Sequence, residues 1–344
     1  MTKKSVTMSD IAKVMNVSTV TVSKALGDRD GVSVELRERI KQKATEMGYR
    51  VHAGSHGAKD GLTYNIGIIV AKHFISDASS FYWIVYRNIV ELLQNQNYYG
   101  MLEVVDNKSM TDPNAVEEVP NTVLDHKVDG LIVLGQLSED YIDRLMQHNL
   151  PTVFLDFYGS RDDVDSVLSD SFYGAYTLTS HLIENGHRRI ACIQGTPHSM
   201  PVRDRVRGFG DTLRAHGLGD RIVVTGEDFS VQNGYLETKL ALAREERPTA
   251  IFALSNLILL GVVKAVHESG LRIPDDISVV SFDDNMLFNY LDPAITCIGQ
   301  PTDEIGTLAV KLLIRAVREP GAAPSHLHLP PSLIIRRSVR NLLL

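Results

Sequence analysis

Residues 7–26 read TMSDIAKVMNVSTVTVSKAL, and this stretch decides the fold of the first part of the chain. Apolar residues recur at helical spacing over residues 8–15, so we expect a short helix with Thr7 or Ser9 as its cap. Asn16 suits the left-handed backbone of a tight turn. The stretch therefore predicts a helix followed by a sharp turn, after which a second helix can begin.

Two further helices are expected beyond this turn. Ser18 can cap a helix over residues 19–26, and Ser33 can cap another over residues 34–47. Each of these segments has apolar residues along one face and polar residues along the other. We therefore predict a three-helix, helix-turn-helix domain over residues 5–50.

The second helix of this head can present its first turn to the major groove of DNA. Its outward residues there would be Thr19, Val20, Ser23 and Lys24. The hydroxyl groups of Thr21 and Ser23 and the capped helix start at Ser33 can contact phosphate. The alternative is a helical mini-domain that does not bind DNA and whose polar face is only solvated.

Charge is distributed unevenly along the chain. Residues 1–60 hold eleven basic and seven acidic residues, a balance of +4, which leaves 24 basic and 35 acidic residues, or −11, for the rest. A basic head on an acidic body fits a polyanion-binding module joined to a part that does not touch the polyanion.

The order of residues in this head, from Val6 to Tyr49, resembles that of the lactose/galactose-repressor family. The resemblance implies a DNA-binding head in which Thr19, Val20 and Lys24 read bases. Lys24 stands where the family usually has arginine, and the base preference there stays open because lysine lacks the bidentate geometry of arginine. The candidate DNA-binding residues are Thr7, Ser18, Thr19, Val20, Thr21, Ser23, Lys24, Ser33 and Tyr49.

The segment after the head departs from the family pattern. The family has Tyr-x-Pro-Asn-x-x-Ala-x-x-Leu, a hinge helix whose leucine wedges into the minor groove, whereas this chain has Val51 for the proline and Ala58 for the wedge. Each of three glycines here costs a helix about 1 kcal/mol, and an alanine methyl is too small to unstack a base step. Residues 51–62 are therefore either a flexible linker or a helix that orders only on DNA, and we expect weak DNA bending.

Residues 63–344 alternate short apolar strands with amphipathic helices, a pattern typical of α/β folds with parallel sheets covered by helices on both faces. A weak internal symmetry suggests two similar subdomains. We expect the first to comprise residues 63–160 and 301–322, and the second residues 161–300 and 323–340.

The body also resembles the family, whose sensor is similar to a type I periplasmic sugar-binding protein. The resemblance rests on the segments DGLI (129–132), PTVFLD (151–156), NGHRRI (185–190), RDRVRGF (203–209), IPDDISVVSFDD (273–284) and LIIRRS (333–338). It implies an effector-binding and dimerisation domain that takes a small molecule, most simply a sugar, between its subdomains.

Ligands of open α/β sheets bind beyond the carboxyl ends of the strands. Asp156 and Asp283 each end a predicted strand, Arg205 lies near the start of a helix, and Phe229 matches the family's stacking aromatic residue. Arg205 and Asp283 are the strongest candidates, although Arg203 and Arg207 lie close by in the sequence. Further candidates are Ser79, Phe81, Tyr82, Ser255 and Asn256.

Asn256 marks a second departure, because the family usually has aspartate there. The expected pocket therefore has one carboxylate fewer than is usual in the family. The identity of the ligand consequently does not follow from the family position.

Other classes of function find less support. The chain shows no nucleotide-binding glycine motif, no nucleophile elbow and no metal-spaced histidines, so we expect no enzyme activity, no cofactor and no metal. It has no secretory signal and no apolar run long enough for a membrane span, which favours a cytoplasmic protein with two reduced cysteines. The sequence predicts a homodimeric repressor of double-stranded operator DNA; the alternative is a cytoplasmic sugar-binding protein or α/β enzyme whose head does not bind DNA.

Overall fold

The computed structural model describes residues 8–26, 30–47, 62–75, 81–106, 117–159, 161–197, 199–219, 223–224, 226 and 228–344. Three candidate residues, Thr7, Tyr49 and Ser79, lie outside these ranges, as does all of the expected linker except Leu62.

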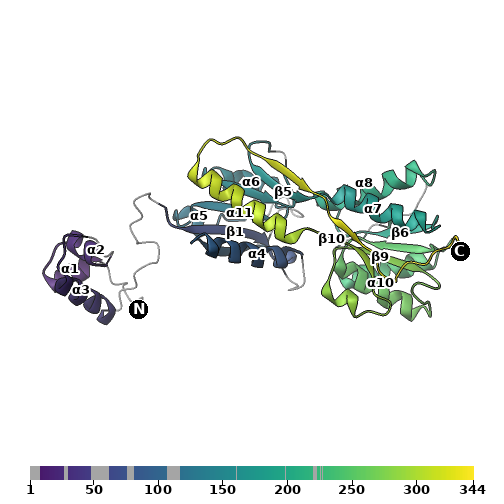
Figure 1. The fold of residues 1–344 in the computed structure, drawn as a ribbon, viewed down its shortest axis with the longest axis horizontal. Helices are drawn as coiled ribbons and strands as arrows, with labels where there is room; N and C mark the ends of the chain where they lie inside the picture. Colours follow the sequence, from purple (N-terminus) through teal and green to yellow (C-terminus); the bar gives the residue numbers. More distant parts are fainter. Residues whose placement is uncertain are drawn as a thin grey trace.

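The head consists of three helices, α1 (Met8–Met15), α2 (Thr19–Leu26) and α3 (Val34–Glu46) (Figure 1). Asn16 has a φ of 52° and makes the turn between α1 and α2, as expected. Ser9 lies inside α1 and so does not cap it. The six side chains at the centre of this small core are all buried: Ile11, Ala12, Val22, Ala25, Ile40 and Ala44.

The body contains two six-stranded sheets with matching topology. The first has the order β11-β5-β4-β3-β1-β2 and the second the order β12-β10-β9-β8-β6-β7. All strand pairs are parallel except β10 with β12. The strands of the first sheet are β1 (Asn65–Ala71), β2 (Tyr99–Val105), β3 (Gly130–Leu134), β4 (Thr152–Leu155), β5 (Asp165–Ser169) and β11 (His326–Leu329). Those of the second are β6 (Ile190–Ile193), β7 (Val223–Val224), β8 (Ala250–Ala253), β9 (Ser278–Phe282), β10 (Thr296–Gly299) and β12 (Ser332–Ile334).

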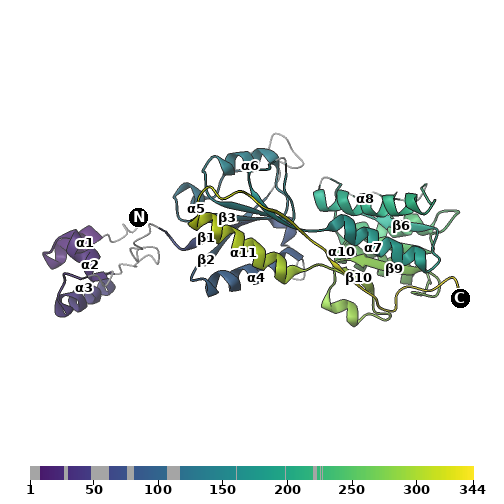
Figure 2. The same ribbon diagram turned by 45° about the horizontal axis from the view of Figure 1, so that its top comes forward.

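Helices cover both faces of each sheet, which explains why central strands such as β3, β6 and β8 contain no polar side chain (Figures 1 and 2). In β1, for example, Ile68 and Val70 belong to one core cluster while Ile69 and Ala71 belong to the cluster on the other face. The helices around the first sheet are α4 (Phe81–Asn95), α5 (Asn121–Leu124), α6 (Glu139–Met146) and α11 (Thr302–Arg318). Those around the second are α7 (Ser171–Glu184), α8 (Met200–Ala215), α9 (Val231–Leu242) and α10 (Asn256–Glu268). None of the helices described is long and apolar enough to cross a membrane.

The chain passes between the two sheets three times, after β5, β10 and β11. The boundaries expected at residues 160/161 and 322/323 need correction, because β5 and β11 pair with each other inside the first sheet. The true crossings lie near residues 170 and 330. The expected boundary at 300/301 agrees with the crossing between β10 and α11.

Candidate functional site

Serine side chains cap the first turns of α2 and α3. The Ser18 hydroxyl accepts a hydrogen bond from the Thr21 amide at 3.0 Å and lies 2.8 Å from the Thr21 hydroxyl. The Ser33 hydroxyl accepts a weaker bond from the Leu36 amide at 3.4 Å. Both helices are therefore capped by the side chains that the sequence singles out.

Val20 is the most unusual residue on this face, since its apolar side chain is 62% exposed. Thr19 is also exposed, whereas Val22 beside them is buried in the head core. Lys24 runs past Gly31, where an added Cβ would lie 3.2 Å from the lysine Nζ. An exposed valine next to hydroxyl and amine groups suits contact with a thymine methyl in the major groove.

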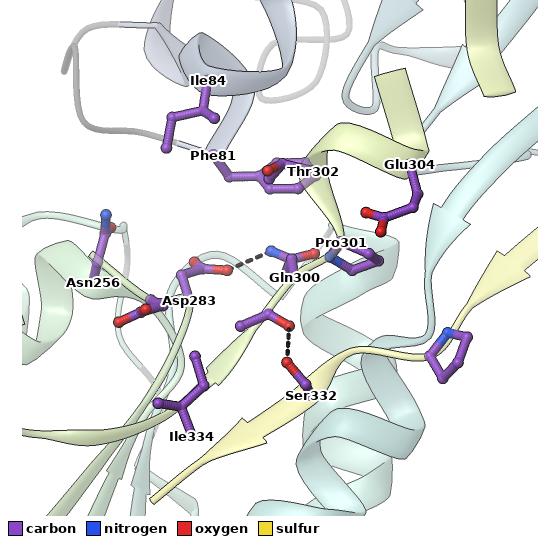
Figure 3. Close-up of a pocket in the computed structure, with 13 residues that line it drawn as sticks. Phe81, Ile84, Asn256, Asp283, Gln300, Pro301, Thr302, Glu304, Ser332 and Ile334 are labelled. Atoms are coloured by element: carbon purple, nitrogen blue, oxygen red, sulfur yellow. Dashed lines mark hydrogen bonds between the residues drawn. The ribbon is translucent and has the colours of Figure 1, made fainter. Parts of the chain in front are cut away.

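A cleft of about 520 Å³ lies between the two sheets, within the usual size range of small-molecule sites. Figure 3 shows Phe81 and Ile84, from the start of α4, across the cleft from Asn256 and Asp283. The crossing after β10 supplies Gln300, the crossing after β11 supplies Pro330, and β12 supplies Ser332. Both subdomains therefore contribute to its walls.

Asp156 follows β4 directly and is almost completely buried. Its Oδ2 accepts a hydrogen bond of 2.6 Å from the Tyr82 hydroxyl at the start of α4. Its Oδ1 is buried with no hydrogen-bond partner among the described residues. A buried carboxylate oxygen without a donor is costly, and Asp156 is not among the residues that line the cleft.

Asp283 follows β9 and pairs with Arg205 of α8. Its Oδ2 lies 3.8 Å from the Arg205 Nη1, and its Oδ1 accepts a hydrogen bond from the Gln300 amide. Arg205 is itself buried: it donates to the Leu254 carbonyl at 2.8 Å, and its guanidinium stacks 3.8 Å from the centre of the Phe282 ring. An ion pair of this length leaves room for a further hydrogen bond to each partner.

The charges of this cluster are coupled across the two subdomains. Burial raises the pKa of Asp156 to about 6, although Arg205 and the Tyr82 hydrogen bond act in the opposite direction. Burial also raises the pKa of Asp283, again against the effect of Arg205. The pKa of Tyr82 lies well above its ordinary value because the ring is buried beside the Asp156 carboxylate. A single arginine thus serves two carboxylates that come from different sheets.

The structure brings together Tyr82, Asp156, Arg205 and Asp283, and it places Phe81 and Asn256 on the cleft wall. Arg205 is buried, whereas its neighbours Arg203 and Arg207 are exposed.

Two of the candidate residues serve local structure. Ser255 caps α10 by accepting from the Ile258 amide at 3.3 Å. Phe229 packs over Gly195 and against both cores of the second sheet, and it does not line this cleft.

Three residues are not predicted from the sequence: Gln300 and Asp284, which line the cleft, and Arg336, which contacts Asp284. Gln300 comes directly after β10, so the rule that ligands lie beyond strand ends would select it once the crossing there is recognised. Asp284 lines the cleft next to Asp283. Arg336 reaches Asp284 from beyond β12, a contact between segments 52 residues apart that no local pattern reveals.

Comparison with known proteins identifies both parts of the chain. Residues 7–51 match the family model of bacterial regulatory proteins of the lacI family. Residues 179–339 match the model of the periplasmic binding protein-like domain.

Similar proteins extend this match to the whole chain. The ribose operon repressor of Haemophilus influenzae is 30% identical over 98% of this chain and 99% of its own length. The HTH-type transcriptional repressor PurR of Photobacterium profundum is 27% identical over the same shares. A LacI family regulator from Enterococcus faecium, solved with bound ribose, has a TM-score of 0.71 at 28% identity and covers 81% of this chain and 99% of its own. With head, sensor and full-length relatives in agreement, this chain belongs to the lacI family of bacterial regulatory proteins.

Proposed function

We propose that this protein is a sequence-specific transcriptional repressor whose affinity for operator DNA is set by a sugar bound in the cleft. The observation that carries the proposal is the cluster of Tyr82, Asp156, Arg205 and Asp283. Because its groups come from both subdomains and Asp283 lines the cleft, a ligand that hydrogen-bonds to Asp283 acts on a network shared by both subdomains.

The head supplies the contacts to DNA. Thr19, Val20 and Lys24 lie on the free face of α2 and read bases, while Ser18, Thr21 and Ser33 contact phosphate. Ser23 supports either role. Two copies of the chain place two heads on a pseudo-palindromic operator, since a two-fold dimer matches two half-sites.

The cleft supplies the effector site. Paired carboxylate and guanidinium groups bind vicinal hydroxyls, which are the defining groups of sugars. Asp283 and Asn256, which line the cleft, make these contacts, and Phe81 covers the apolar face of the ring. Arg205 and Asp156 do not line the cleft and act through Asp283. Phe229, at the family's stacking position, packs over Gly195 and does not line the cleft.

The chain is organised as a head at residues 5–50, a linker at 51–62 and a sensor at 63–344 that also dimerises. Effector binding changes the angle between the subdomains of the sensor and thereby the spacing of the heads. Such an effect requires the effector to bind the two states with different affinity. The protein works without catalysis, as its repressor relatives do, and in the cytoplasm, where its operator lies.

A thermal-shift screen of the full-length protein tests this proposal. Neutral sugars, including D-ribose, D-glucose and cellobiose, are compared with nucleobases and amino acids. We expect one sugar to raise the melting temperature and Asp283→Asn to abolish that rise. Stabilisation confined to nucleobases or amino acids would overturn the sugar effector and leave the DNA-binding role intact.

A further inference from the structure

We propose that Asp284 and Arg336 form a charge-compensated pair that determines which charge of effector the cleft accepts: neutral sugars bind and phosphorylated sugars are excluded. The inference rests on the proposed function, because it concerns the same cleft. It assigns Asp284 as a second effector-binding carboxylate and Arg336 as the residue that positions it.

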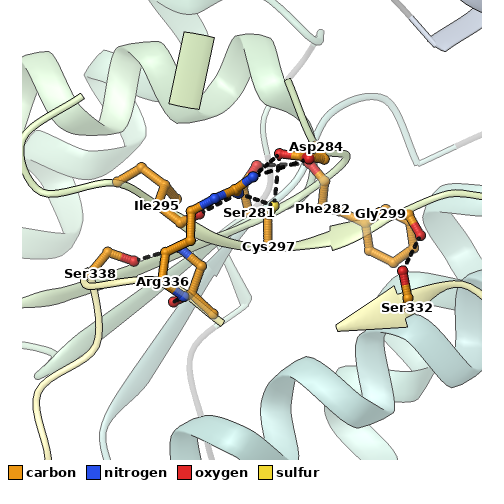
Figure 4. A network of polar contacts seen from close by, with 10 residues as sticks. Ser281, Phe282, Asp284, Ile295, Cys297, Gly299, Ser332, Arg336 and Ser338 are labelled. Atoms are coloured by element: carbon orange, nitrogen blue, oxygen red, sulfur yellow. Dashed lines mark hydrogen bonds and ion pairs between the residues drawn. The ribbon is translucent and has the colours of Figure 1, made fainter. Parts of the chain in front are cut away.

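Arg336 holds Asp284 from behind through several contacts (Figure 4). Its Nη2 lies 2.9 Å from Oδ1 and 3.1 Å from Oδ2 of Asp284, while its Nη1 donates to the Ile295 carbonyl at 2.8 Å. The Cys297 thiol adds a hydrogen bond of 3.2 Å to Asp284. The Arg336 side chain is 12% exposed, so this geometry is fixed by packing.

Asp284 keeps a free side toward the cleft. Its side chain is 30% exposed and forms part of the cleft wall. A carboxylate offers about four lone-pair directions, and Arg336 and Cys297 do not use them all. The remaining lone pairs can accept hydrogen bonds from ligand hydroxyl groups.

Two consecutive carboxylates therefore face the cleft, and each has its own arginine. Arg205 of α8 forms an ion pair with Asp283, and Arg336 forms an ion pair with Asp284. Neither arginine lines the cleft, so carboxylate oxygens are the charged groups that this wall presents to a ligand.

The described residues of the cleft wall include Glu304 in addition to these two aspartates and include neither lysine nor arginine. A phosphate group in the cleft would meet carboxylate oxygens at short range, and repulsion between like charges in a partly buried site is strong. The wall thus favours a ligand that donates hydrogen bonds and carries no negative charge.

The chain contains a matched control for this pair. Arg337 and Asp292 lie 3.7 Å apart, with side chains 75% and 94% exposed. Because this second pair is on the surface and away from the cleft, changes to it alter the same charges without touching the site.

The experiment compares D-ribose with D-ribose 5-phosphate, and D-glucose with D-glucose 6-phosphate, by calorimetric titration of the full-length protein. We expect at least tenfold weaker binding of the phosphorylated member of the pair whose neutral member binds. In Asp284→Asn, the neutral sugar binds at least tenfold more weakly. The preference for the neutral member also falls at least tenfold, because Arg336 is left without its carboxylate. Asp292→Asn changes neither the affinity for the neutral sugar nor the preference for it over the phosphorylated sugar by more than twofold.

Positioning by Arg336 is tested with Arg336→Lys and Arg336→Met, with Arg337→Met as the control. We expect both Arg336 variants to bind the neutral sugar at least fivefold more weakly, and the melting temperature without ligand reports any loss of folding. A defect in folding alone lowers binding of both sugars equally, whereas loss of the pair changes their ratio.

Equal or tighter binding of the phosphorylated sugar by the unaltered protein would overturn the inference, as would an unchanged ratio in Asp284→Asn. Absence of binding by every sugar would instead overturn the sugar effector itself.

Discussion

Asp156 and Asp283 occupy equivalent positions in the two sheets of the sensor. Each follows the third strand counted from the corresponding edge, β4 in one sheet and β9 in the other. Each has a φ of 68°, a left-handed backbone that turns the side chain out at the end of its strand. The repeated fold thus places one carboxylate from each subdomain near Arg205; Asp283 lines the cleft, whereas Asp156 is buried and does not line it.

The raised pKa of Asp156 predicts a specific dependence of stability on pH. The folded state holds the proton of this carboxyl up to about pH 6, whereas the unfolded chain loses it near 3.8. The protonated Asp156 carboxyl therefore contributes fully to the free energy of unfolding below pH 3.8. This contribution is lost as the pH rises to about 6, a difference of about 3 kcal/mol. Asp156→Asn removes this titration while keeping an oxygen that accepts from Tyr82.

Urea unfolding from pH 4 to pH 8 measures this effect. We expect Asp156→Asn and the unaltered protein to be equally stable near pH 4, and the variant to become more stable as the pH rises to 6, by up to about 3 kcal/mol. Asp292→Asn, a change at the surface, serves as the control. Parallel stability curves for Asp156→Asn and the unaltered protein would contradict this assignment.

Removal of Arg205 is expected to be strongly destabilising, because Asp283 and Asp156 then remain buried without a cation. The free energy of unfolding in Arg205→Met should fall by about 3–5 kcal/mol at pH 7.5. The exposed Arg207 pairs only at 3.7 Å with Asp204, so Arg207→Met should cost less than about 1 kcal/mol. In the double variant with Asp283→Asn, part of the loss should be recovered; an additive loss would count against the pairing.

Val20→Ala separates stability from recognition in the head. Since Val20 is exposed, we expect an unchanged melting temperature of the head and a loss of discrimination between operator and variant sites at one base pair. Val22→Ala, at a fully buried position, should instead cost about 2 kcal/mol of stability. Binding of both variants to a set of single-base operator variants provides the measurement, and unchanged discrimination in Val20→Ala would remove this residue from the interface.

The segment after the head lies outside the described residues, and its sequence alone carries a prediction. Ala58 stands at the position of the family's wedge leucine, so the bound operator should be bent only weakly. Ala58→Leu should increase the bend, measured by energy transfer between dyes at the ends of an operator fragment. A strongly kinked operator in complex with the unaltered protein would refute the prediction.

Much of the fold follows from the sequence because its central strands are apolar on both faces. Strands such as β3, β6 and β8 stand out for this reason. In contrast, β5, β11 and β12 contain polar residues and do not stand out. Since β5 and β11 lie next to two of the crossings, the sequence misplaces those subdomain boundaries.

The site is predictable to the extent that it obeys a local rule. Asp156 and Asp283 end apolar strands and are found in this way, and the motif around Arg205 points to its helix. The sequence does not separate Arg205 from Arg203 and Arg207, because burial is decided by how α8 packs on the second sheet. Arg336 and Gln300 escape notice because their roles depend on contacts between segments distant in the sequence.

A titration of operator DNA shows whether a sugar in the cleft controls the affinity of the head for DNA. Operator binding by the full-length protein is measured with and without the sugar that stabilises it, for the unaltered protein and for Asp283→Asn. We expect the sugar to change the operator affinity at least fivefold, in either direction, and Asp283→Asn to bind the operator without responding to the sugar. An operator affinity that is the same with and without the bound sugar in the unaltered protein would contradict the account.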